Sequence, residues 1–130
     1  MSRAERRRAR SAAPLEGRYG YSRAVRVGDR VIVAGTAPIW PDDFVDPDPE
    51  AQTRRCCEII TAALAELGAA PGDVVRTRMF VTGAALADVV GPIHGEFFGE
   101  AAPAATMVVV AGLLDPRWVV EIEAEADLSG

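Results

Sequence analysis

Hydrophobic and polar residues alternate near the start of the chain. Residues 21–27 read Tyr-Ser-Arg-Ala-Val-Arg-Val, and residues 30–35 form a second run that contains several β-branched side chains. Gly28 and Asp29 separate the two runs, and a two-residue connection of this kind is typical of a β-hairpin. The pattern therefore predicts two antiparallel strands, followed by a loop over residues 36–49 in which four prolines and four aspartates occur.

The hydrophobic period becomes helical after this loop. Asp48, Pro49 and Glu50 are typical of a helix start, because they supply an N-cap acceptor, a proline at the first helical position and an acid near the positive end of the helix dipole. Apolar side chains then recur every three or four positions as far as Leu67, just before Gly68. The sequence predicts a helix over residues 49–67 with one face packed on a sheet.

The second half of the chain predicts another helix and three more strands. Residues 74–82 alternate, with Val75, Thr77, Met79 and Val81 expected on one side. Residues 84–98 predict a helix with a kink or break near Gly91, because a Gly-Pro pair follows there.

Two strands are predicted over residues 104–110 and 119–126. In the last one, valine, isoleucine and alanine take one face, while Glu121, Glu123 and Glu125 take the other.

The order β-β-α-β-α-β-β predicts an α+β fold, in which a mixed β-sheet carries two helices on one face. The opposite face of such a sheet needs apolar cover from a partner chain, so we expect self-association. The length of 130 residues corresponds to one domain, which we place at residues 19–130.

Charge is distributed unevenly along the chain. The net charge is −5, yet five arginines lie within the first ten residues. We interpret residues 1–18 as a disordered, arginine-rich, solubilising tail, with a nucleic-acid-binding arm as the alternative. The acidic remainder argues against nucleic acid as a partner, because it repels phosphate backbones. No apolar stretch follows the arginines as in a signal peptide, and no apolar run is long enough to span a membrane, so we expect a cytoplasmic protein.

Composition also excludes some kinds of chemistry. The chain contains no lysine, which rules out Schiff-base catalysis by a lysine amine. Cys56 and Cys57 are adjacent and form neither a useful disulfide loop nor a metal site by themselves. His94 is the single histidine and has no cysteine or acid beside it at metal-ligand spacing, so we expect no metal.

Seven segments of the chain together resemble the YjgF family, the RidA-type reactive-intermediate deaminases. They are residues 21–29, 33–39, 50–54, 73–77, 96–99, 103–104 and 120–124. The resemblance implies the bacterial chorismate-mutase-like (YjgF) fold. It also implies a homotrimer with a small-molecule cleft at each subunit interface. Active members of the family hydrolyse 2-imino or 2-enamino acids to 2-keto acids and ammonia, and the resemblance implies that no cofactor is used.

One important position departs from the family pattern. The usual motif is Pro-Ala-Arg-Ser, whose arginine binds the substrate carboxylate, but here residues 103–106 read Pro-Ala-Ala-Thr. Ala105 replaces the arginine, and an alanine offers no donor to a carboxylate. Met107 and Gly91 also replace residues common in the family, a cysteine and an asparagine.

The retained residues define a candidate site. Glu121 matches the acid that positions water in active relatives and is the candidate catalytic residue; a solvated row of acids is the alternative. The candidate substrate-binding residues are Tyr21, Arg23, Thr36, Ala105, Thr106 and Trp118. Arg23 shares a strand face with Tyr21 and is the best substitute for the missing arginine, although exposed arginines are usually only solvated.

Two hypotheses of function follow. The first is a cofactor-independent hydrolytic deaminase of an imine, enamine or related reactive metabolite, with activity on standard 2-imino acids in doubt because of Ala105. The second is a noncatalytic trimer that binds a small metabolite in the same cleft. An older family label, ribonuclease or translation inhibitor, is a weaker third, since the acidic body argues against it.

Overall fold

The computed structural model describes residues 5–11 and 13–130, and these form one six-stranded sheet in the order β1-β2-β3-β6-β4-β5. The strands are β1 (Arg6–Ala9), β2 (Ala24–Val27), β3 (Arg30–Thr36), β4 (Val74–Val81), β5 (Ala104–Val109) and β6 (Val120–Asp127). The pair β4 and β5 is parallel, and the other neighbours are antiparallel. The sheet is therefore mixed, as predicted.

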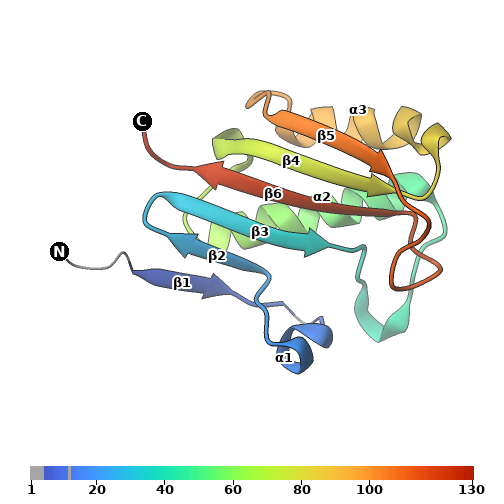
Figure 1. The fold of residues 1–130 in the computed structure, drawn as a ribbon, viewed down its shortest axis with the longest axis horizontal. Helices are drawn as coiled ribbons and strands as arrows, with labels where there is room; N and C mark the ends of the chain where they lie inside the picture. Colours follow the sequence, from blue (N-terminus) through green and yellow to red (C-terminus); the bar gives the residue numbers. More distant parts are fainter. Residues whose placement is uncertain (1–4, 12) are drawn as a thin grey trace.

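The helices are α1 (Leu15–Tyr19), α2 (Pro49–Glu66) and α3 (Ala87–Phe98), and short 3-10 turns occupy Pro41–Asp43, Pro71–Asp73 and Ala84–Leu86. Figure 1 shows α2 and α3 on the same face of the sheet. Helix α2 packs against β3, β6 and α3. The α+β architecture with α2 and α3 covering one face is confirmed.

Helix α2 begins and ends as the sequence predicts. The Asp48 side chain accepts a hydrogen bond from the Glu50 backbone N–H at 3.2 Å, and Pro49 occupies the first turn. Leu67 is the C-cap, and Gly68 follows with a φ of +84°, a left-handed conformation that glycine adopts without strain. The face toward the sheet is fully buried and includes Cys56, Cys57, Ile60 and Leu64.

Strand β6 lies between β3 and β4 and is flanked by both. Its apolar residues Val120, Ile122, Ala124 and Ala126 are buried under the helices, whereas the three glutamates alternate with them on the opposite face. The predicted alternation is confirmed, and it places the row of acids on the face that the helices leave open.

The prediction that Val75 lies on the same face of β4 as Thr77, Met79 and Val81 is wrong. Val75 is 47% exposed, and Val74 is buried in its place. The register against β6 shifts between Val74 and Arg76, as at a β-bulge, and one extra residue reverses the direction of every side chain before it. Thr77, Met79 and Val81 lie beyond the irregularity and are buried as predicted.

The predicted break near Gly91 is also wrong. Helix α3 continues through Gly91 and Pro92 to Phe98. Its buried residues Val90, Ile93 and Phe98 lie on both sides of the proline. Packing of this apolar face outweighs the missing amide donor of Pro92.

The amino-terminal region differs from the predicted tail over residues 1–18. Arg6–Ala9 forms β1 along the edge of β2, and Leu15–Tyr19 forms α1 (Figure 1). Ala9 is buried against Ala24, and its carbonyl accepts the backbone N–H of Arg23 at 2.9 Å. A strand held by backbone hydrogen bonds needs little hydrophobic periodicity, which explains why the arginine run gave no strand signal. Residues 1–4 and 12 of the predicted tail lie outside the described residues.

The face of the sheet opposite α2 and α3 carries apolar as well as charged side chains. Ile32 and Val108 are exposed there, beside the ion pair between Arg78 and Glu123 at 2.8 Å. Within the described part of the chain, none of the helices has the length and apolarity needed to cross a lipid bilayer.

Candidate functional site

A cavity of about 880 Å³ opens at one end of the sheet. Its walls come from the end of β3, the start of β6, α1 and two loops, residues 37–45 and 114–118. Figure 1 shows that the two loops lie at the same end of the sheet, where β3 ends and β6 begins. The antiparallel pairing of these two strands is what brings the loops together.

Glu121 lies at the start of β6 and lines this cavity. Its side chain is half-buried, and burial raises the pKa of its carboxyl, an effect that the charge of Arg23 opposes and that of Glu123 reinforces. A carboxylate with a raised pKa holds a proton more readily than one in water and is suited to proton transfer.

Gly35 provides the space for this carboxylate. The register of β3 against β6 is irregular between Val33 and Thr36, and a bulge of this kind redirects nearby side chains. A Cβ added at Gly35 would lie 2.5 Å from Oε2 of Glu121. Only glycine leaves the acid in its observed position.

We therefore expect Gly35→Ala to displace the Glu121 carboxylate without unfolding the protein, because the clashing atom is the end of a flexible side chain. A function that uses this carboxylate should weaken by up to about 100-fold, the effect expected when a catalytic group is misplaced by about 1 Å. Ligand affinity and the melting temperature, measured on the same sample, check this. Gly83→Ala is a control, since a Cβ there meets nothing within 4 Å. Equal function in both variants would contradict the role of Gly35.

Arg23 is held in the wall of the cavity. Arg23 is 4% exposed, and its Nη2 donates a hydrogen bond to the Gly35 carbonyl at 2.6 Å. Nη1 lies 4.0 Å from Oε2 of the buried Glu16, and the guanidinium carbon lies 5.8 Å from the centre of the Tyr21 ring. Little of this guanidinium faces the cavity. This arrangement suits a residue that fixes the β3 backbone at Gly35 and places a positive charge near Glu121.

Trp118 and Tyr21 also line the cavity, and their role in substrate binding stays a prediction. The Trp118 backbone N–H donates to the Asp115 carbonyl at 3.0 Å, which closes the turn before β6. Its ring Nε1 is buried and has no hydrogen-bond partner within the described part of the chain.

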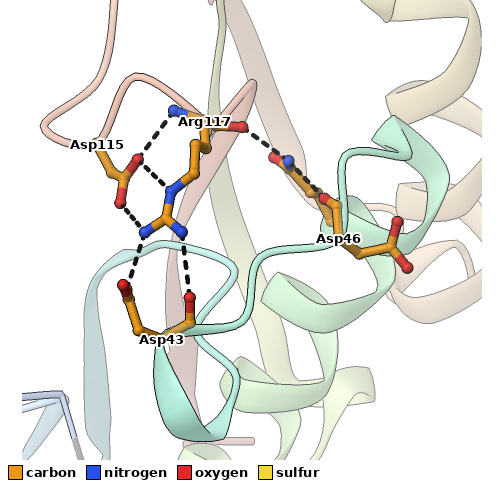
Figure 2. Close-up of polar contacts among 5 residues, drawn as sticks. Asp43, Asp46, Asp115 and Arg117 are labelled. Carbon is orange, nitrogen blue, oxygen red and sulfur yellow. Dashed lines mark hydrogen bonds and ion pairs between the residues drawn. The ribbon is translucent and has the colours of Figure 1, made fainter.

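Arg117 ties the two loops of the cavity to each other, as Figure 2 shows. Its Nη2 donates to the Asp115 carboxylate at 2.7 Å and to the Asp43 carboxylate at 2.9 Å, and Nη1 donates to the Asp43 carbonyl at 3.1 Å. These hydrogen bonds lower the pKa of Asp115 and raise the pKa of Arg117. Arg117 is therefore occupied in fixing the loops.

Gln52 on α2 makes a second, buried connection between the same loops. Its Nε2 donates to the carbonyls of Asp46 and Arg117, each at 2.9 Å, and its Oε1 accepts the Val119 N–H at 2.8 Å. Both acceptor residues, Asp46 and Arg117, are labelled in Figure 2. The two loops that line the cavity are thus connected through a buried amide whose two N–H groups and carbonyl oxygen all have partners.

Three of the candidate substrate-binding residues lie outside this cavity. Thr36 is buried, and its hydroxyl donates to the Ala34 carbonyl at 2.8 Å. Ala105 and Thr106 are exposed on β5, which β4 separates from β6. Within one chain these residues do not line the cavity with Glu121.

Sequence reasoning missed several residues of this cavity, among them Gly35, Arg55 and Phe44. Arg55 lies on α2, and its Nε donates to the Ile39 carbonyl at 2.6 Å. The helical period places Arg55 only on a polar face, so no pattern signals that a distant loop folds over it. Gly35 lies within a segment that carries the family resemblance, which is the one signal that marked it.

The fold defines an α+β protein with a mixed sheet, and comparison with known proteins gives the family. The family model described as Endoribonuclease L-PSP matches residues 11–128. The chain therefore belongs to this family, the YjgF/RidA family that its motifs resemble.

Individual relatives agree with this assignment. SCO2049 of Streptomyces coelicolor is 40% identical over 121 residues, which cover 92% of this chain and 90% of the relative. The 2-iminobutanoate/2-iminopropanoate deaminase of Salmonella typhimurium is 35% identical over 111 residues, covering 82% of this chain and 85% of the relative.

Solved structures show the same fold. Rv2704 of Mycobacterium tuberculosis, described as a member of the YjgF/YER057c/UK114 family, superposes with a TM-score of 0.86. It is 41% identical, and the match covers 95% of this chain and 99% of Rv2704.

Proposed function

We propose that this protein is a homotrimeric, cofactor-independent hydrolytic deaminase of the RidA type, which acts on an imine or enamine in a cleft at the subunit interface. The observation that carries the proposal is Glu121, a half-buried carboxylate with a raised pKa in the wall of a cavity of about 880 Å³. Membership of a family that includes a named imine deaminase supports the reaction class.

The reaction consumes one water molecule. The Glu121 carboxylate accepts a proton from water while the water oxygen forms a bond to the imine carbon, and the C=N electron pair moves to nitrogen, which takes up a proton. The resulting carbinolamine gives its hydroxyl proton to Glu121 as the C–N bond breaks, and nitrogen takes this proton from Glu121, as it does in the first step, so that ammonia and a carbonyl compound are released. An enamine enters the same sequence after protonation at carbon.

In this proposal Arg23 fixes the β3 backbone at Gly35 and balances the charge of Glu121. The Tyr21 ring packs against the guanidinium of Arg23. Ala105 and Thr106 are exposed on an edge strand, where a neighbouring subunit can reach them. Thr36 then supports the bulge through its bond to the Ala34 carbonyl rather than binding substrate.

We expect weak activity on 2-iminopropanoate, because Ala105 offers no donor to its carboxylate and Arg23 is buried. Loss of a charge-assisted contact corresponds to roughly a 10- to 100-fold lower kcat/KM. Stopped-flow hydrolysis of the imine generated by an amino-acid oxidase measures this, with the Salmonella deaminase as the reference. Ala105→Arg should recover part of the difference. Activity equal to that of the reference would show that another residue binds the carboxylate.

We expect a trimer in solution, because exposed Ile32 and Val108 lie on the sheet face that α2 and α3 leave open. Sedimentation equilibrium should give about three times the chain mass of 13.8 kDa. Ile32→Glu should reduce the mass toward that of a monomer, whereas Ala62→Glu, at an exposed position on α2 and outside the cavity, should not. A stable monomeric wild type would contradict both the trimer and the interfacial cleft.

The second candidate function is a noncatalytic trimer that binds a metabolite in the same cleft, and the specific observation in its favour is Ala105. The two functions differ in turnover. Ammonia release from a panel of enzymatically generated imines favours the deaminase, and saturable binding with no ammonia release favours the binding protein.

A further inference from the structure

Aromatic residues are concentrated in the cavity beside Glu121. The chain contains two tryptophans, two tyrosines and four phenylalanines, and both tryptophans, both tyrosines and one phenylalanine line this cavity. They are Tyr19, Tyr21, Trp40, Phe44 and Trp118. They come from α1, the segment before β2 and the two loops, so no single element explains why they meet.

In the single chain, two of these rings are not covered by other side chains. Tyr19 is 64% exposed and Phe44 is 55% exposed, and Leu114 beside them is 81% exposed. Trp40 and Phe44 pack edge to face, with ring centres 5.6 Å apart and planes at 66°. A cluster of exposed apolar rings around a cavity marks a binding surface, because such an area in water is unfavourable.

The loop that carries Trp40 and Phe44 is fixed in place. Asp42 and Asp43 between them have positive φ values of 61° and 57°, which non-glycine residues rarely adopt. Arg117 holds Asp43, and Arg55 holds the Ile39 carbonyl at 2.6 Å. The ring pair is therefore presented in one arrangement before any ligand binds.

The part of the cavity that a single chain lines is also large for the smallest imino acids. Its volume of about 880 Å³ lies in the upper part of the range of roughly 300–1,000 Å³ found for sites that hold drug-sized ligands. A three-carbon substrate would leave most of the aromatic wall in contact with water.

We propose that the substrate of this site is an aromatic imine or enamine, whose ring packs among Tyr19, Trp40 and Phe44 while the reacting carbon faces Glu121. The proposal rests on the deaminase function above. The charge of Glu121 favours a neutral or protonated imine, and the buried position of Arg23 disfavours a ligand carboxylate. The substrate class is therefore an aromatic imine without a required carboxylate.

Three stable amides test the proposal, because a primary amide has the planar shape of an imine and its N–H groups can donate to Glu121. The probes are benzamide, cyclohexanecarboxamide and acetamide, titrated into the full-length protein by calorimetry. Tryptophan fluorescence provides a second readout, since both tryptophans line the cavity. We expect benzamide to bind about three- to tenfold more tightly than cyclohexanecarboxamide, through aromatic contacts beyond area burial, and at least about tenfold more tightly than acetamide.

A pair of variants locates the ring. Phe44→Leu keeps apolar surface at an exposed position and should reduce the preference for benzamide over cyclohexanecarboxamide by at least about threefold. Phe97→Leu, on α3 away from the cavity, should leave that preference unchanged. Equal affinity for benzamide and cyclohexanecarboxamide, or a preference that survives Phe44→Leu, would overturn the inference.

Turnover separates this inference from the proposed function. Imine hydrolysis without an aromatic preference would contradict the aromatic substrate class and leave the deaminase intact. An aromatic preference without ammonia release from the imine of benzylamine, generated by a flavin amine oxidase, would contradict the deaminase and leave the aromatic binding site supported.

Discussion

Glu121→Gln should lower kcat/KM for imine hydrolysis by at least about 100-fold while the fold and the oligomeric mass remain unchanged. The amide keeps the shape of the side chain in the space beside Gly35 but cannot accept a proton from water. Initial rates of ammonia release, together with sedimentation of the same sample, measure both parts of the expectation.

The dependence on pH gives a second readout for the same variant. Glu121 acts as a base only when it is deprotonated, so wild-type activity should rise with pH through a pKa above the usual glutamate range, because burial raises that pKa. The residual activity of Glu121→Gln should lack this rise with pH. The same shift means that the folded state disfavours the charged carboxylate, so the variant should be at least as stable as the wild type at neutral pH.

Glu123→Gln is the matched control, since Glu123 lies on the same face of β6 but pairs with Arg78 at 2.8 Å. The Glu123→Gln variant should retain activity, and its activity should still rise with pH as in the wild type. Equal behaviour of the two variants would instead favour a solvated row of acids, and normal turnover in Glu121→Gln would leave the noncatalytic function.

Gln52→Leu should destabilise the protein by about 3 kcal/mol, because leucine fills the space but leaves two carbonyls and the Val119 N–H without their partner. Urea unfolding monitored by circular dichroism measures the change in the free energy of unfolding. Affinity for any ligand of the cavity should fall as well, since the loops lose their buried connection.

Thr53→Val is the control for Gln52→Leu. Thr53 is the next residue of α2, is equally buried, and bonds only the Pro49 carbonyl of its own helix at 2.8 Å. Its loss should cost about 1 kcal/mol and leave ligand affinity unchanged. Equal losses in the two variants would mean that Gln52 contributes no more than an ordinary buried side chain.

Local signals predicted most of the elements, and long-range contacts decided the rest. The alternation of β6 and the cap at Asp48 depend on neighbours in sequence and were confirmed. The reversal at Val75 depends on the register against a strand that lies far along the chain, and the continuity of α3 depends on packing around Pro92. Neither can be obtained from periodicity alone.

The sequence likewise predicted some features of the candidate site and not others. Glu121, Tyr21, Arg23 and Trp118 line one cavity, and their catalytic and binding roles stay predictions. The burial of Arg23 could not be predicted, because it depends on Glu16 in the segment expected to be a tail. Phe44 was missed because a proline-rich loop has no period from which its contacts can be predicted.

The position of β6 in the sheet has a consequence for synthesis of the chain. Strand β6 is the last strand in chain order, yet it joins β3 to β4 at the centre of the sheet. While β6 is still inside the ribosome, the β1-β2-β3 and β4-β5 parts have no strand to connect them, and Glu121 has not emerged. The sheet and the candidate site are therefore completed together, after the rest of the domain has been translated, and until then the unpaired edges of β3 and β4 are open to aggregation.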